Sequence, residues 1–349
     1  MYTREIQTPR SSPVENRMPL QGTWDRAFDE VSLLDIHQPY SFPLPRWVKD
    51  CRIKEWEWFY VQDDRFFLEA MLCNVKLYRL VRILLYDKES GEKFTFTKPL
   101  PGSGWRLPRS LGNAAFGSRS PGFFFRVHTW LNADTIKLDF DLRAARGRPD
   151  LTAHLAFSMK NADVTPMAVS LNFAERRNMY AFKAIAPVRG DIVAGGRHFG
   201  LDPARTSGIF CDYKGYYPYR MRGVFCGAAG FDPEGRRFGF HIVENQTRES
   251  RKNNENALWV NGHLTPLPQV RITMPEGIDS DWIIQDVEGM VDLVFTPKEP
   301  NRLGARLLLT SVGLDAPLGY YNGILVNAEG AHIQVRNLWG MGEKLYLRV

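Results

Sequence analysis

The sequence predicts an all-β protein, and three observations carry this prediction. Apolar and polar residues alternate in many short segments, which is the period of a β-strand with one face against a core. Turn-forming residues recur between these segments. No long segment has apolar residues at helical spacing, and the 29 glycines and 22 prolines are spread too evenly for long helices. Many short strands at regular spacing are typical of barrels and sandwiches.

The clearest strands lie in the middle and toward the end of the chain. In residues 136–143 every second side chain is apolar and the intervening ones are Lys, Asp or Arg, so one face is predicted to be buried and the other wet. The same alternation recurs over 151–159, 291–295 and 333–335. Each of these segments has the length of an ordinary strand.

Turn chemistry separates the predicted strands. Residues 88–91, 232–235 and 327–330 combine Asp, Asn, Glu, Ser or Pro with a final Gly, which is typical of tight turns. Asn261-Gly262 is the sharpest hairpin signal, because both residues tolerate positive φ.

The two halves of the chain follow a similar plan. An aromatic-rich opening, at 56–60 in one half and 213–219 in the other, precedes strand, turn and strand. We therefore predict two antiparallel β-barrels or half-barrels packed in tandem. The expected division is an N-terminal extension over 1–20, a first β domain over 21–195 and a second over 196–349.

Composition limits the class of protein and its partners. The 349 residues carry a formal net charge of +6, spread along the chain, which fits a mildly basic surface better than a nucleic-acid footprint. Residues 1–20 lack the apolar core of a secretory signal, and no segment has the ~18 uninterrupted apolar residues that a membrane span needs. We expect a cytoplasmic protein without a transmembrane segment or a nucleic-acid partner. Peripheral membrane contact and the oligomeric state stay open.

Common catalytic and metal-binding signatures are absent from the sequence. It holds no H-E-x-x-H, Walker A, complete G-x-G-x-x-G or G-x-S-x-G pattern. The seven histidines are dispersed and the four cysteines form no C-x-x-C pair, so we expect no metal and no cofactor, and cysteines that are reduced and buried.

Trp56 and Trp58 are the first candidate ligand-binding residues. They are two apart, so on a strand they share one face, while Glu55 and Glu57 share the other. The Trp pair either lines an apolar cavity or packs into an ordinary core with the two Glu side chains in solvent.

A second group of candidates surrounds Pro218. Tyr216, Tyr217, Tyr219 and Arg220 offer hydroxyls and a guanidinium on amphipathic side chains, which suits the mouth of an apolar pocket with a few orienting hydrogen bonds. The alternative is a tyrosine-rich strand corner.

Glu255 and Asn256 come just before an apolar strand and form the third group. A carboxylate there becomes a general acid or base if an apolar wall raises its pKa. Asn256 would then hold a substrate oxygen or fix the carboxylate, and Asp212 would supply a second catalytic carboxylate. The alternative is a pair that caps the turn ahead of the strand.

These segments together resemble a known family. Lys54-Glu55-Trp56-Glu57-Trp58, the run from Asp212 to Arg220, the run from Glu255 to Gly262 and then Leu293-Val294-Phe295-Thr296-Pro297 occur in this order. The combination is similar to the family named domain of unknown function 2804, over about residue 20 to the C-terminus. Where the family has an aromatic followed by Gly-Arg-Gly, this chain has Tyr213-Lys214-Gly215, and a Trp common a few residues later is replaced in the neighbourhood of Val224-Phe225.

The resemblance implies a fold and lends no established activity. The family's fold is similar to that of tandem lipocalin-like proteins, which include carotenoid hydratases and tocopherol cyclase. Fold analogy alone does not fix function. Together with the residues above, it predicts binding of an apolar, lipid- or isoprenoid-like molecule in a barrel or inter-barrel cleft, extended to hydration, isomerisation or cyclisation by acid–base catalysis. The alternative is a carrier or protein-interaction scaffold without turnover, and the sequence does not decide whether the chain is an enzyme.

Overall fold

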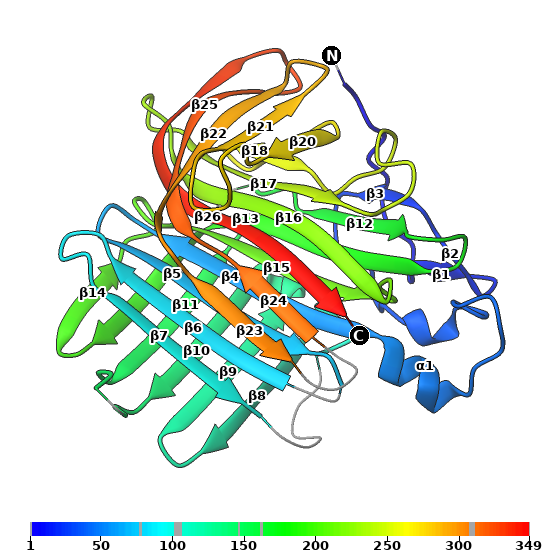
Figure 1. Cartoon of the computed structure of the whole chain (residues 1–349), viewed down its shortest axis with the longest axis horizontal. Helices are drawn as coiled ribbons and strands as arrows, with labels where there is room; N and C mark the ends of the chain where they lie inside the picture. The colour runs from blue at the N-terminus through cyan, green and yellow to red at the C-terminus, as the bar shows by residue number, and fades with distance from the viewer. Residues whose placement is uncertain are drawn as a thin grey trace.

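The protein is almost entirely β-structure, in two large curled antiparallel sheets (Figure 1). This is a computed structural model that describes residues 2–76, 79–100, 107–145, 147–160, 163–306 and 311–348. The prediction of an all-β fold made of two half-barrels in tandem is confirmed. Within the described residues, one α-helix occurs, α1 (Arg46–Arg52), together with the short 3-10 helices η1 (Leu33–Asp35) and η2 (Leu131–Ala133).

The first sheet is built from the N-terminal part of the chain. Its main path runs in the order β7-β6-β5-β4-β15-β13-β11-β10-β9-β8, with β12 and β14 also paired to β13, and β3 paired to β12. Its strands are β3 (Gly22–Trp24), β4 (Lys54–Gln62), β5 (Phe66–Asn74), β6 (Arg79–Asp87), β7 (Lys93–Pro99), β8 (Ala114–Ser120), β9 (Phe123–Trp130), β10 (Thr135–Leu142), β11 (Leu151–Ser158), β12 (Met167–Asn172), β13 (Asn178–Ala194), β14 (Arg197–Leu201) and β15 (Ser207–Gly215).

The second sheet uses the rest of the chain. Its main path runs in the order β19-β18-β17-β16-β26-β25-β22-β21-β20, and β24 pairs with β23 and β26. Its strands are β16 (Arg220–Phe231), β17 (Arg237–Asn245), β18 (Ala257–Val260), β19 (His263–Pro266), β20 (Val270–Thr273), β21 (Trp282–Asp286), β22 (Val291–Glu299), β23 (Arg302–Arg306), β24 (Ser311–Asp315), β25 (Leu318–Val326) and β26 (His332–Arg348). A small hairpin, β1 (Val14–Glu15) with β2 (Met18–Pro19), stands apart.

The change of sheet comes later than the predicted boundary at 195/196. Strands β14 and β15 still pair with β13 in the first sheet, and the second sheet begins with β16 at Arg220. Within the predicted N-terminal extension, Gln7 exchanges backbone hydrogen bonds with the β3 region, through Thr23 and Asp25. The extension is therefore anchored on the first half of the fold.

Burial patterns show which strands have one covered face and which have two. In β10 the apolar side chains are buried and the intervening ones are exposed or half-buried, as the alternation predicts. Strands β4, β6 and β15 are buried at every position. Their sheet curls around a core on one face and packs against the second sheet on the other, which produces strands that are apolar or internally paired throughout.

The predicted turns lie between strands. Asn261 and Gly262 form a two-residue connection from β18 to β19, with φ values of 48° and 87°. Positive φ at both positions is what a hairpin with the ordinary right-handed twist requires. Residues 88–91, 232–235 and 327–330 connect β6 to β7, β16 to β17 and β25 to β26.

The apolar interior has three parts: one inside each half-barrel and one between the two sheets. All four cysteines are free. Cys211 and Cys226 are buried as predicted, whereas Cys73 is half-buried and Cys51, on α1, is exposed.

Candidate functional site

An apolar cavity lies between the two sheets, and the predicted Trp pair forms part of its wall. Trp56 and Trp58 line it from β4, and Leu314, Leu345 and Leu347 from the second sheet. Its volume is about 60 Å³. Because nearly all of its surface is hydrocarbon or aromatic carbon, it offers no set of polar partners for a water molecule.

An aromatic wall continues from this cavity into the inter-sheet core. Trp56 stacks on Tyr217 with ring centroids 4.7 Å apart, and Tyr213 lies 5.6 Å from Trp56 and 6.0 Å from Trp58. Strands β4 and β15 are neighbours, and their register places Tyr213 opposite Trp56. The alternation of the two strands thus gathers the rings on one face.

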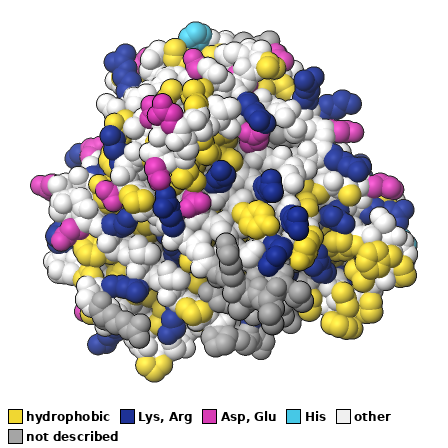
Figure 2. Space-filling model, in the orientation of Figure 1, with side chains coloured by type: hydrophobic (Ala, Val, Ile, Leu, Met, Phe, Trp, Pro, Cys, Tyr) yellow, Lys and Arg dark blue, Asp and Glu magenta, His cyan; other side chains and the backbone are white. Residues whose placement is uncertain are grey.

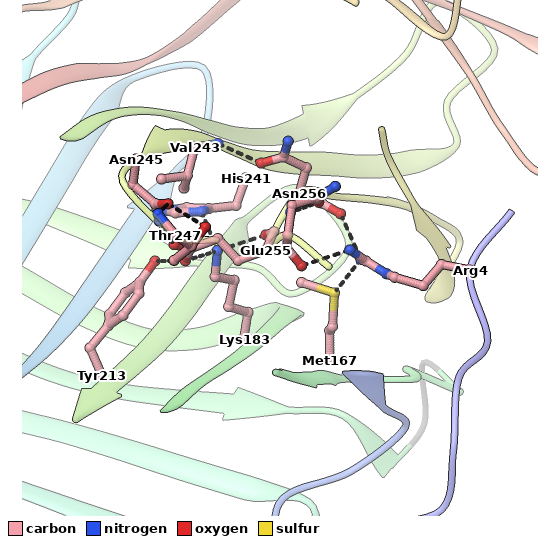
Figure 3. Close-up of polar contacts among 11 residues, drawn as sticks. Arg4, Met167, Lys183, Tyr213, His241, Val243, Asn245, Thr247, Glu255 and Asn256 are labelled. Carbon is pink, nitrogen blue, oxygen red and sulfur yellow. Dashed lines mark hydrogen bonds and ion pairs between the residues drawn. The ribbon is translucent and has the colours of Figure 1, made fainter. Parts of the chain in front are cut away.

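Behind the wall, Tyr213 joins a buried polar network centred on Glu255 (Figure 3). The Tyr213 hydroxyl donates to Glu255 Oε2 at 2.9 Å, and Asn245 Nδ2 donates to Oε1 at 2.7 Å. Lys183 Nζ lies 2.8 Å from Oε2 and also donates to the Glu255 main-chain oxygen at 2.9 Å and to His241 Nδ1 at 2.8 Å. The ammonium group therefore has three acceptors, and each carboxylate oxygen has at least one donor.

The protonation states of this network follow from burial and from one fixed cation. Burial, and next the positive charge of Lys183, lower the pKa of His241 well below its usual value. Burial, and next the negative charge of Glu255, raise the pKa of Tyr213 well above its usual value. His241 is thus a neutral acceptor and Tyr213 keeps its proton, beside the Lys183–Glu255 ion pair.

Asn256 is buried beside Glu255 but braces the backbone instead of the carboxylate. Its Oδ1 accepts from the Val243 N–H at 2.7 Å, and its Nδ2 donates to the Pro268 carbonyl at 2.8 Å. Arg4 crosses from the N-terminal segment and donates to the Asn254 carbonyl at 2.6 Å (Figure 3). Neither the Asn256 side chain nor the Arg4 side chain lines the cavity.

The structure does not bring Asp212 and Glu255 together. Successive residues of a strand face opposite ways, so Asp212 points into the first half-barrel while Tyr213 points between the sheets. There Asp212 is ion-paired with Lys214 and lies opposite Glu57 in the register. Burial raises the pKa of Asp212 and of Glu57.

The expectation that Glu55 and Glu57 face solvent, if the Trp pair is core, is wrong. Glu57 is completely buried, and Glu55 is buried with Lys76 Nζ 2.8 Å from its carboxylate. The reason is that β4 is a central strand whose second face lies inside the first half-barrel.

The tyrosine-rich run is divided among three environments. Tyr217 belongs to the inter-sheet aromatic wall, whereas Tyr216 is buried in the first half-barrel core with its ring 5.9 Å from Tyr40. Tyr219 and Arg220 lie on the surface, with Tyr219 47% exposed. Of the four residues predicted at a pocket mouth, only Tyr217 is part of the aromatic wall.

A second buried polar cluster ties the two sheets together. The Tyr60 hydroxyl donates to Glu343, and Arg82 pairs with Glu69 at 3.0 Å and donates to the Asn301 side chain. Burial, and next the charge of Glu69, raise the pKa of Glu343 to about 8. Glu343 is on β26 and its partner Tyr60 on β4, so this cluster acts across the interface.

Four members of the Glu255 network were not predicted as site residues: Lys183, Tyr213, His241 and Asn245. Lys183 had a signal: it is the only charged residue between Asn178 and Val188, an otherwise largely apolar run. His241 follows Phe238-Gly239-Phe240 in the same way. A charged or titratable residue in a segment that is otherwise apolar, and therefore expected to be buried, needs a hydrogen-bond or ion-pair partner inside the protein.

Among the residues that the structure describes, no group of three His, Cys, Asp or Glu side chains is placed to hold a metal ion. In the same part of the chain, no helix has both the length and the apolar character that crossing a membrane requires.

The profile of the family described as "Domain of unknown function (DUF2804)" matches residues 20–348. The chain belongs to this family. That match includes both sheets, the aromatic wall and the Glu255 network.

No curated protein matches the chain in sequence. The chain is similar to a crystal structure of kievitone hydratase from Nectria haematococca, with 12% sequence identity over 84% of this chain and 88% of that chain and a TM-score of 0.47.

Proposed function

We propose that this DUF2804 protein binds an apolar, lipid- or isoprenoid-like small molecule, with an apolar end of the ligand in the inter-sheet cavity. The observation that supports this most directly is the cavity wall, where Trp56 and Trp58 meet five leucines and nearly all of the lining surface is apolar. Ligand pockets combine such apolar walls with a few polar groups nearby.

The cavity volume limits how much of the ligand enters. An engineered apolar cavity of about 150 Å³ binds benzene, and this one measures about 60 Å³. A small branched end of a hydrocarbon chain is the matching size. The rest of the ligand would lie outside the cavity, beyond Leu303 and Val312, the half-buried residues of its wall on β23 and β24.

Binding is tested by native mass spectrometry after incubation with a total lipid extract. We expect a discrete adduct that a denatured control lacks. Val312→Phe places a ring at the cavity and should reduce the adduct, because overpacking removes the space. Val326→Phe is the matched control, since Val326 is also half-buried but packs against the core of the second half-barrel. Absence of any adduct, or equal loss in both variants, would overturn the proposal.

We further propose that Tyr213, Glu255 and Lys183 support acid–base chemistry on this ligand. Tyr213 favours this, because its ring contacts both cavity-lining Trp residues while its hydroxyl is held by Glu255. A positioned proton donor with a linked carboxylate is the arrangement that general acid–base catalysis uses. Asp212 takes no part, since it faces the first half-barrel.

Variants of Glu255 and Tyr213 separate binding from turnover. Glu255→Gln and Tyr213→Phe should keep the adduct but abolish conversion, read as a gain of one water for hydration or as a changed retention time at equal mass for isomerisation or cyclisation. Conversion that survives both substitutions would refute this role.

A carrier without turnover is the second candidate, and one observation favours it. Both Glu255 oxygens already have donors, and the aromatic wall stands between them and the cavity. An adduct that is retained by every variant and never converted by the wild-type protein would decide for the carrier.

A further inference from the structure

The segment around α1 presents its apolar side chains to solvent. None of the seven residues of α1 is buried, whereas a surface helix ordinarily buries one apolar face. Trp47 is 71% exposed and Phe42, five residues earlier, is 54% exposed, which makes them the two most exposed aromatic residues in the described chain. Lys49 holds the helix from beneath, by donating to the carbonyls of Leu34 and Ile36.

Positively charged side chains lie around the residues that precede these exposed aromatics in the chain. Burial, and next the charges of Arg17, Arg176 and Lys49, lower the pKa of His37, which lies just before the segment. Arg52 and Arg177 lie 5.0 and 4.5 Å from the ring of Tyr40. Figure 2 shows apolar side chains gathered at the edge of the molecule where Figure 1 places α1, with Lys and Arg side chains beside them.

Some acidic residues are present, but they are already paired. Asp35 lies 3.5 Å from Arg46, Asp50 lies 3.3 Å from Lys76, and Glu175 lies 3.7 Å from Arg176. Arg17 has no ion-pair partner within the described residues, and its neighbour Met18 is 37% exposed. The surface therefore combines exposed apolar side chains with a surplus of cations.

This surface adjoins one end of the inter-sheet cavity. Lys54 Nζ donates to the Cys51 carbonyl at the end of α1 and to the Val75 carbonyl, at 2.8 and 3.1 Å. Val75 lines the cavity together with Leu347. The Lys76–Asp50 pair makes a second link between α1 and the same turn.

We propose that the surface formed by Phe42, Trp47, Met18 and Arg17 docks the protein on an anionic lipid bilayer. Aromatic rings are favoured at the membrane–water interface, and Lys or Arg near an anionic leaflet adds attraction. A standard protein partner would need about 800 Å² of complementary surface on this side, whereas the exposed large apolar side chains of this surface are three, Met18, Phe42 and Trp47. Docking would place one end of the cavity beside the hydrocarbon from which an apolar ligand comes, and this last clause rests on the proposed function.

The test is co-sedimentation with lipid vesicles, which needs no bound ligand. Wild-type protein should bind vesicles that contain phosphatidylserine with phosphatidylcholine, and bind them less at higher salt. Phe42→Ala/Trp47→Ala should reduce this binding at least tenfold. Trp130→Ala is the matched control, because Trp130 is 43% exposed on the first sheet, and it should bind as the wild type does.

The charge component has its own matched pair. Arg17→Gln should weaken binding about fivefold, the value expected for one cation near an anionic surface. Arg189→Gln removes an exposed cation from β13 and should leave binding unchanged.

Three results would overturn the docking proposal: no binding to phosphatidylserine vesicles, equal binding by Phe42→Ala/Trp47→Ala and wild type, or equal losses in the Trp130 control. Thermal unfolding of each variant checks that it is folded, and we expect all of them to be, because the substituted side chains are exposed. The ligand adduct from lipid extract is measured on the same variants. A variant that no longer binds vesicles but still forms the ligand adduct supports the docking proposal. If the wild-type protein binds vesicles but forms no adduct, only the proposal of ligand binding in the cavity is refuted.

Discussion

Removing the buried ammonium of Lys183 should be among the most damaging single changes to stability. The side chain is 0% exposed and faces three acceptors: Glu255 Oε2, the Glu255 main-chain oxygen and His241 Nδ1. Lys183→Met keeps the length of the side chain but leaves a buried carboxylate without its cation. Breaking one partner of a buried ion pair costs about 3–5 kcal/mol, and we expect a loss of unfolding free energy of this size.

A second substitution shows whether the unpaired charge is the cause. Glu255→Gln in the Lys183→Met background removes the charge, so the double variant should recover more than half of the loss and the two effects should be strongly non-additive. The assay is equilibrium unfolding in urea followed by tryptophan fluorescence. Lys137→Met, on the exposed face of β10, is the control and should change stability by less than about 0.5 kcal/mol. A loss below about 1 kcal/mol for Lys183→Met, or simple additivity in the double variant, would refute the reasoning.

Three further predictions concern the rest of the fold. Glu343 has a folded-state pKa of about 8 against an ordinary 4.5, so the stability that its carboxyl group contributes is lost as pH rises between these two values. Glu343→Gln should remove this part of the pH dependence of the unfolding free energy, measured by urea unfolding across the range. An unchanged pH dependence would contradict the prediction. Gly190→Ala should lower the unfolding free energy by more than about 4 kcal/mol or prevent folding, because the added Cβ would lie 1.8 Å from the His154 carbonyl oxygen at a φ of +134°. Gly235→Ala is the control: its φ is +79° but its surroundings are open, so it should cost about 1 kcal/mol. Similar shifts of the melting temperature for both variants would count against this. Asn256→Ala should lower the unfolding free energy by about 2–5 kcal/mol, because the buried Val243 N–H and Pro268 carbonyl lose their hydrogen-bond partner. The variant should still form the ligand adduct. Loss of the adduct in a folded variant would show a direct contact between Asn256 and the ligand instead.

The fold was predictable because its signals are local. Alternation in residues 136–143 and Asn-Gly at 261–262 each depend on a few neighbouring positions, and both have the predicted structure. The position at which the chain passes from the first sheet to the second was harder to predict. Strand β15 joins the first sheet through its pairing with β13 and β4, and pairing partners far along the chain leave no local signal.

The candidate site could be predicted only in part, for a related reason. The alternation of side chains along a strand correctly places Trp56 and Trp58 on one face, but it does not show whether the other face meets solvent or a second core. The alternative with the Trp pair in an ordinary core therefore puts Glu57 in solvent, although it is buried. The network of Glu255 with Lys183 joins residues 72 positions apart, and only the three-dimensional structure brings them together.

The long strand β26 has a consequence for the order in which the protein is made. It pairs with β16, β24 and β25 at the centre of the second sheet, yet it follows every other strand of that sheet along the chain. During synthesis, the facing edges of β16 and β25 must therefore stay unpaired until β26 has left the ribosome. Leu345 and Leu347 arrive with it, so the cavity between the sheets closes only when β26 pairs, and until then the open edges of β16 and β25 are exposed to edge-to-edge aggregation.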